Sequence, residues 1–397
     1  MKRIVIQNVL SLFVAAAALS APARATEPAE VPGLVAERPA TGPAIQTDLG
    51  FMVPYTVTIP GSKVTFDMVP IPGGTCRIGS PDGEPGRQPT ESPTFEAQIE
   101  PFWMARCETS WAEYKLYMAL FSPFKEFETR GIRKPADNEA DAITSPSRLY
   151  DPTFTFDKGD DPRLPAVSMS QYAAKQYTKW LSGLTTQFCR LPTEAEWEHA
   201  CRAGTTTAYS FGDDPAELDE FGWCHANSGD EPHFVGLKKP NPWGLHDMHG
   251  NACEWVLDGG LDDGYSQQAG RQLGWKDAIV WPQEVSPRIL RGGTWDSDAA
   301  DCRSAARLYS DDRAWCETDP NLPKSPWWFT DGPALAVGFR VIRPLHAPAA
   351  SERGKYWDAD VESIRRAVAQ RISEGRGAAG VADADLPAAL QSLKKPK

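Results

Sequence analysis

The spacing of apolar residues along the chain predicts three short helices. Apolar positions recur at helical intervals in residues 110–121, 170–184 and 193–204. In the first and third segments a Ser or Thr is followed three residues later by Glu, which is a helix-start signature. The stripes are mainly aromatic and contain Trp111, Tyr114, Tyr117, Phe121, Tyr177 and Trp180. We interpret these residues as core packing rather than as contacts to a cofactor.

Short strands are expected where Val, Ile and Phe lie between turn residues. The first is expected within residues 64–69, before a tight reversal at Gly73 and Gly74. Others are expected at residues 289–290 and within "AVGFRVIRPL", residues 336–345. The 32 Gly, 35 Pro and 14 Trp favour a loop-rich fold, because Gly and Pro build turns and large aromatic residues hold loops on a core.

The two ends of the chain differ from its middle. Lys2 and Arg3 precede an apolar run that ends before Ala23-Arg24-Ala25, which predicts a cleaved signal peptide over residues 1–25. A membrane anchor is the alternative, although a run of roughly 16 apolar residues is short for a membrane span. We expect a disordered linker over 26–55, one domain over 56–345, and an amphipathic helix with a flexible tail over 346–397.

Charge and cysteine content limit the function classes. Loss of three basic residues with the signal peptide moves the formal net charge from −12 to −15, which disfavours nucleic acid and anionic membranes as partners. Eight cysteines include no CxxC pair, so a zinc ribbon and a thioredoxin-type site are not indicated. In an exported chain they are compatible with disulfides, and Cys302 with Cys316 would close a short loop.

Several ordered motifs resemble the sulfatase-modifying factor family, which includes the formylglycine-generating enzymes. They are "MVPIPGGTCRIGS", "FWMARCETSWAEY", "PAVSMSQYAAKQYTKWL", "CRLPTEAEWEHACRAG", "NPWGLHDMHGNACEWVLD", "RGGTW" and "VGFRVIRPL". The resemblance covers about residues 60 to 345. It implies an α/β (α+β), loop-rich single domain of the C-type-lectin-like class with little regular secondary structure.

The resemblance also implies where a reaction centre would lie. Related enzymes oxidise a sulfatase cysteine to an aldehyde with oxygen and a copper ion held by two thiolates, which suit Cu(I). Counted without gaps, Ser297 occupies the first copper position, Cys302 the second, and Thr294 the place of a serine near the reacting oxygen. Cys253 and Cys316 are the other candidate thiols. The chain therefore lacks an intact two-cysteine copper site.

Other roles are carried over from the family residue by residue. A calcium ion is implied at the carbonyls of His249, Gly250 and Ala252 with the Glu254 carboxylate, and Asn227 resembles a ligand of a second calcium site. The alternative is that this loop is only a stabilised turn. Cys201 matches a position that pairs with another cysteine in the animal enzyme. The residues implied as structural, in ion pairs or framework, are Arg190, Glu194, Glu198, Arg307 and Arg340.

The expected function is that of an exported, periplasmic or extracellular binding or accessory protein. Its partner is expected to be a protein, a peptide or a glycan in the envelope, with a sulfatase among the candidates. The competing hypothesis is an oxidase that converts a sulfatase Cys or Ser to formylglycine. No stable membrane span is expected after signal cleavage.

Overall fold

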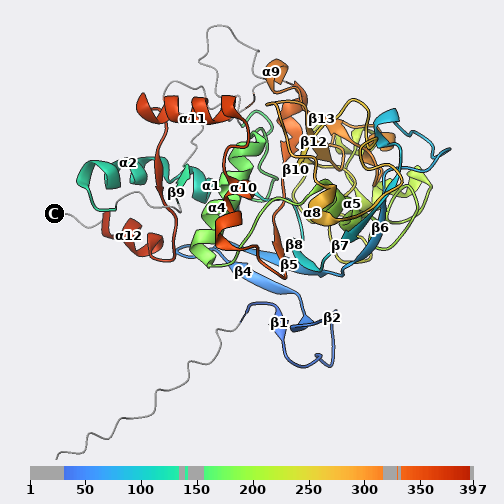
Figure 1. Ribbon diagram of the computed structural model, residues 1–397, viewed down its shortest axis with the longest axis horizontal. Coiled ribbons are helices and arrows are strands. Elements are labelled where there is room, and N and C mark those ends of the chain that lie inside the picture. The colour runs from blue at the N-terminus through green and yellow to red at the C-terminus, as the bar shows by residue number, and fades with distance from the viewer. Residues whose placement is uncertain (1–30, 134–138, 142–155, 316–328, 330–331, 394–397) are drawn as a thin grey trace, which may run out of the picture. The chain divides into compact units, whose positions relative to one another are not determined.

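The computed structural model describes residues 31–133, 139–141, 156–315, 329 and 332–393. Residues 33 onward form one compact unit, and the predicted signal peptide lies outside the described residues. Among the helices that are described, none is long and apolar enough to cross a membrane. The elements of this unit are shown in Figure 1.

Three sheets form the centre of the unit. One has the antiparallel order β15 (Ile342–Pro344), β8 (Phe102–Ala105), β5 (Thr65–Ile71) and β4 (Tyr55–Thr58). The second has the order β13 (Leu308–Tyr309), β12 (Arg288–Arg291), β10 (Cys253–Gly259) and β14 (Val337–Gly338). The third has the order β11 (Gln272–Gly274), β7 (Phe95–Ile99) and β6 (Gly74–Ile78). The strands expected at 64–69, 289–290 and 336–345 are confirmed.

Between β8 and β10, the described residues form four helices of eight residues or more: α1 (Trp111–Met118), α2 (Phe121–Arg130), α4 (Gln171–Thr185) and α5 (Glu194–Arg202). The predicted start signals are confirmed, because Ser110 with Glu113 and Thr193 with Glu196 form capping boxes. The aromatic residues of these stripes are buried except Phe121, which is half-buried at the start of α2, and Tyr114 and Tyr177 stack between α1 and α4.

The other helices and 3-10 turns described between β6 and residue 358 are short. The helices are α6 (Leu218–Phe221), α7 (His225–Ser228), α8 (Trp275–Ala278), α9 (Asp312–Trp315) and α10 (Gly354–Trp357). The 3-10 turns are η1 (Pro89–Glu91), η2 (Pro215–Glu217), η3 (Ala299–Cys302), η4 (Gly332–Ala336) and η5 (Ala350–Glu352). The described part of the chain is therefore rich in loops, as its composition suggests.

The prediction of a disordered linker over residues 26–55 is wrong for residues 31–55, the part that the structure describes. Residues 34–52 form a sheet of β1 (Leu34–Val35), β3 (Gly50–Met52) and β2 (Ile45–Thr47), and β4 starts at Tyr55. Met52 is buried, and the indole Nε1 of Trp103 donates a hydrogen bond to the carbonyl of Val53. A few long-range anchors thus order a segment whose composition alone resembles a linker.

The predicted C-terminal helix is confirmed as α11 (Glu362–Ser373). The prediction of a flexible tail after it is wrong for residues 379–393. They form β16 (Ala379–Val381) and α12 (Leu386–Leu393), and β16 pairs with β9 (Glu139–Asp141). β16 packs against α2 and β9 against α4 (Figure 1). Small residues allow this, since a Cβ at Gly380 would lie 2.5 Å from the Phe124 ring.

Candidate functional site

The turn after β12 contains the residues aligned with the family's reaction centre. Gly292 and Gly293 have φ of 100° and 73°, values that favour glycine, and they redirect the chain after the buried strand. The backbone N–H of Thr294 donates to Ser297 Oγ at 2.9 Å, and the two hydroxyl oxygens lie 3.0 Å apart. The N–H of Asp296 donates to Thr294 Oγ1 at 3.1 Å. Both hydroxyls therefore hold the turn together.

Cys302 lies at the end of η3 and is completely buried. It packs in a small apolar cluster with Tyr209, Leu218 and Cys224, and a Cβ at Gly293 would lie only 2.6 Å from its sulfur. Burial raises the pKa of the Cys302 thiol well above its usual value, which disfavours the thiolate that copper needs. The structure thus places Cys302 beneath the turn rather than in an open site beside Ser297.

The other cysteines do not complete a copper centre among the described residues. Cys253 is buried on β10 with its sulfur 3.4 Å from the carbonyl of Ala336, and Cys316 lies outside the described residues. Each of the seven described cysteines is unbridged. Cys201 faces a serine, with its sulfur 3.6 Å from Ser304 Oγ. Cys224 packs in the same cluster as Cys302, but both cysteines are buried there and burial raises the pKa of Cys302, so this arrangement does not fit an accessible two-thiolate copper ion.

His249 joins the loop after α7 to the segment that contains Cys302. Its Nε2 accepts a hydrogen bond from the Ser210 backbone N–H at 3.2 Å, so its Nδ1 donates to the Cys302 carbonyl at 2.8 Å. Burial lowers the pKa of His249 to about 4, which keeps the ring neutral at physiological pH. The side chain of His249 is therefore used in the framework.

Glu254 does not fit a calcium ion as a carboxylate ligand. Its two oxygens accept hydrogen bonds from the Arg340 guanidinium at 2.6 to 2.8 Å, and Oε2 also accepts from Trp197 Nε1 at 2.7 Å. Glu254 and Arg340 are both completely buried. The guanidinium already supplies the positive charge that a cation would bring to this carboxylate. Gly250 and Ala252 lie in the same buried loop.

Asn227 does not fit a metal either. Its Oδ1 accepts from the Cys224 backbone N–H at 2.8 Å, and its Nδ2 donates to Asp219 Oδ1 at 2.9 Å and to the Gly222 carbonyl at 3.0 Å. The ammonium of Lys238 lies 3.4 Å from the same Asp219 oxygen. The amide of Asn227 caps α7, and a lysine supplies the local positive charge.

The residues expected to be structural lie in a buried ion-pair network around α5. Arg190 donates two hydrogen bonds to Glu196, while Glu194 is paired with Arg291 and Arg307. Glu198 is paired with Arg202 and Arg291. The partner of Arg190 is thus Glu196, a neighbouring glutamate of the motif. The buried pairs of Arg291 with Glu194 and Glu198 hold α5 against β12.

Sequence reasoning missed a buried carboxyl pair, Glu108 and Asp247. Glu108 Oε1 accepts from Asn251 Nδ2 at 3.0 Å, and Asp247 Oδ2 accepts from the Gly236 N–H at 2.6 Å. Their other oxygens have no hydrogen-bond partner among the described residues. Burial raises the pKa of both carboxyl groups above their usual values, and the negative charge of Asp247 adds to this effect at Glu108. Acidic residues inside apolar motifs were the only sequence signal for it.

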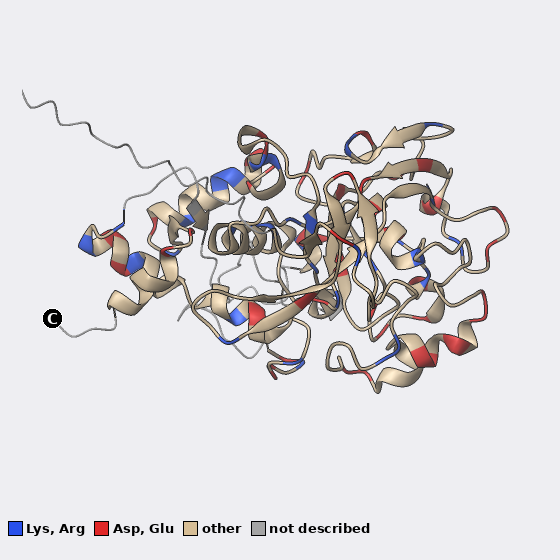
Figure 2. Cartoon of the chain, turned by 90° about the horizontal axis from the view of Figure 1, so that it is seen from below, with Lys and Arg blue, Asp and Glu red and all other residues tan. Residues whose placement is uncertain are grey.

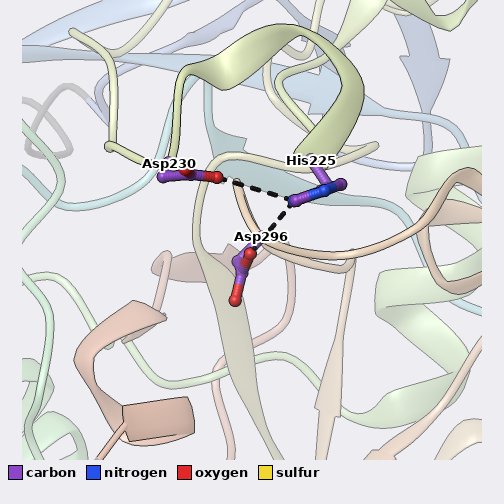
Figure 3. Close-up of side chains that lie close together, drawn as sticks. All are labelled: His225, Asp230 and Asp296. Atoms are coloured by element: carbon purple, nitrogen blue, oxygen red, sulfur yellow. Dashed lines mark hydrogen bonds and ion pairs between the residues drawn. The ribbon is translucent and has the colours of Figure 1, made fainter.

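An exposed cluster beside Ser297 was also missed. His225 Nδ1 lies 3.3 Å from Asp296 Oδ1 and 3.6 Å from Asp230 Oδ1, and the side chains are 59%, 70% and 75% exposed (Figure 3). The N–H of His225 donates to the Ser297 carbonyl, which ties the cluster to the turn. These three side chains could hold a divalent cation or accept hydrogen bonds from a basic group. The nearby acids in "HANSGD" and "WDSDAAD" are its sequence signal.

This cluster belongs to a wider acidic surface. The exposed acids on the two adjacent loops are Asp230, Glu231, Asp296, Asp298 and Asp301. Over the chain as a whole, Lys and Arg lie among Asp and Glu (Figure 2), and the ammonium of Lys158 lies 3.3 Å from the Asp230 carbonyl, so the five acids outnumber this nearby base. The surface next to Ser297 is therefore negatively charged, which favours a basic partner.

Comparisons with known proteins agree with the motifs. The model of the family described as "Sulfatase-modifying factor enzyme 1-like domain" matches residues 58–315. The formylglycine-generating enzyme of Thermomonospora curvata is 25% identical over an alignment of 280 residues, and the match covers 62% of this chain and 88% of that protein. The formylglycine-generating enzyme of Bos taurus is 25% identical over an alignment of 288 residues, and the match covers 63% of this chain and 72% of that protein.

Two further matches concern a part of a longer protein and the fold. The serine/threonine-protein kinase pkn1 of Chlamydia caviae is 36% identical over 144 residues, or 36% of this chain. The match spans only 21% of the kinase. The structure of PvdO from Pseudomonas aeruginosa covers 80% of this chain and 100% of its own, with a TM-score of 0.52 and 23% identity. That likeness confirms the expected fold class.

Proposed function

Because the chain belongs to the sulfatase-modifying factor enzyme 1-like family, we propose that it is an exported member that binds a partner without oxidising it. The observation that carries this proposal is the burial of Cys302 beneath Gly293, with a serine at the position of the other thiolate. A thiol that is buried and protonated offers neither a copper ligand nor a group in contact with a substrate. The competing hypothesis, a formylglycine-generating oxidase, requires two accessible thiolates.

The partner that we propose is a basic segment of an envelope protein, such as a sulfatase peptide. The acidic loops at residues 225–231 and 296–301 flank Ser297, and opposite charges on the partner would speed association and fix its register. Export is part of the proposal and rests on the predicted signal peptide at residues 1–25.

The test uses residues 26–397, a copper(I) salt, oxygen and a sulfatase-type peptide, with aldehyde formation followed by mass spectrometry. We expect no aldehyde, and we expect the peptide to bind more weakly as salt concentration rises, because the attraction is electrostatic. The double variant D230N/D296N is expected to weaken binding at low salt, whereas D262N/D263N, which changes two exposed acids on another loop, is the matched control. Aldehyde formation that is lost in C302A would overturn the proposal in favour of the oxidase.

A further inference from the structure

A cavity lies at the far end of the strands that lead to the turn containing Ser297. Its volume is about 520 Å³, and it is lined by Gly259 and Gly260 at the end of β10 and by the loops over residues 267–287. In the antiparallel pairing of β10 with β12, Glu254 lies opposite Arg291 and Gly259 opposite Arg288. The turn containing Ser297 follows Arg291, so the cavity and that turn are at opposite ends of the pair. Its volume is within the range of ligand pockets, roughly 300 to 1,000 Å³.

The side chains around this cavity can both donate and accept hydrogen bonds. Gln267, Gln268 and Gln283 provide amides, each of which donates and accepts. One basic and two acidic side chains, Arg271, Asp277 and Glu284, also line it, together with a partly exposed Trp281. The charges nearly balance, with a small excess of acid. Such a lining disfavours a purely apolar ligand and an anionic ligand.

Gln268 has an unsatisfied group at this cavity. Its side chain is only 5% exposed, and its Oε1 has no hydrogen-bond partner among the described residues. A buried amide oxygen without a partner costs roughly 1 to 3 kcal/mol, which is why such groups are rare in folded proteins. The oxygen is enclosed in this structure, and the soft last torsion of a glutamine side chain allows the amide to rotate and bring it to the cavity that Gln268 lines. A ligand hydroxyl there would satisfy it.

Trp281 is held in place by the C-terminal segment. Its ring centroid lies 5.8 Å from that of Tyr356 on α10, and the Lys355 ammonium lies 5.7 Å from the ring centroid. Tyr356 is buried and thus anchors this wall of the cavity. An indole that is fixed before binding loses little conformational entropy when a ligand packs on it.

From this geometry we propose that the cavity binds a neutral saccharide. Sugar hydroxyls both donate and accept, as the amides and carboxylates of the lining do, and the C–H face of a sugar ring packs on an aromatic ring such as that of Trp281. The orphan Oε1 of Gln268 accepts one hydroxyl. This site is distinct from the acidic surface beside Ser297, and the inference does not depend on the proposed function.

The experiment measures binding to residues 26–397 by isothermal titration calorimetry. The probes are three neutral trisaccharides, N-acetylchitotriose, maltotriose and cellotriose, with triglycine as a peptide comparison. We expect at least one trisaccharide to bind and triglycine not to bind. The variant W281A is expected to weaken that binding at least tenfold, whereas W243A, a partly exposed tryptophan outside this cavity, is expected to leave it unchanged.

Gln268→Met separates a ligand-binding role from a structural one. Methionine has nearly the shape of glutamine but no amide, so it removes the unsatisfied oxygen, and the melting temperature is expected to stay level or rise. The same variant is expected to bind the trisaccharide at least tenfold more weakly. The inference is overturned if none of the trisaccharides binds at millimolar concentration, if triglycine binds instead, or if Q268M and W281A both bind as well as the unmodified chain.

Discussion

At the scale of single residues, the Glu113 side chain caps a helix, but its ionisation lowers the stability of the folded state. Its Oε2 accepts hydrogen bonds from the backbone N–H and the hydroxyl of Ser110, at 2.9 and 2.6 Å, which starts α1. Burial raises its pKa to about 7. Because the folded-state pKa exceeds the unfolded value, the folded state binds the proton more tightly and stability declines as pH rises from about 4.5 through 7.

The variant E113Q is expected to remove this decline. Glutamine keeps the acceptor oxygen of the capping box and has no carboxyl to ionise. At pH 8 we expect E113Q to be more stable than the unmodified chain by on the order of 1–3 kcal/mol, and near pH 4 we expect the two to be equal. Urea unfolding at both pH values measures this. A difference that is the same at pH 4 and pH 8 would show that ionisation of Glu113 is not its cause.

At the scale of elements, the C-terminal segment over residues 354–393 is held by a buried charge cluster. Asp360 accepts two hydrogen bonds from Arg288 on β12, at 2.7 and 2.8 Å, and one from Lys175 on α4 at 3.1 Å. These cations hold the pKa of Asp360 well below its usual range, although burial alone would raise it. The cluster joins three elements that are far apart in the sequence.

Removal of the Asp360 charge is therefore expected to be costly. D360N leaves the buried Lys175 and Arg288 without their carboxylate, and breaking such a buried pair costs about 3–5 kcal/mol. The matched control is D358N, because Asp358 is 55% exposed and pairs with Lys179 at the surface. We expect that control to lose about 1 kcal/mol or less in urea unfolding. Equal losses in the two variants would contradict a special role for the buried cluster.

At the scale of the whole molecule, the sequence predicted what local patterns can encode. Ser110 with Glu113 and Thr193 with Glu196 mark helix starts through contacts within one turn, and the ordered motifs identify the family. The pairing of β16 with β9, the Glu108–Asp247 pair and the cavity at Gln268 all join segments far apart along the chain. No spacing rule places such segments together, so these features required the structure.

The same long-range contacts bear on whether the folded chain needs calcium. Arg340 donates hydrogen bonds to the carboxylate of Glu254. The ammonium of Lys238 lies beside the Asp219 carboxylate that accepts a hydrogen bond from Asn227. Positively charged side chains thus lie where the family resemblance implies calcium. We expect the melting temperature of residues 26–397 to be the same in EDTA and in millimolar calcium. An ion that binds only the folded state and is present at 100 times its Kd would raise the free energy of unfolding by about 2.7 kcal/mol. The melting temperature would then rise by several degrees. If calcium raised the melting temperature of the unmodified chain by that amount but not that of D247N, this expectation would be contradicted. The ion would then be assigned to the open oxygens of Glu108 and Asp247.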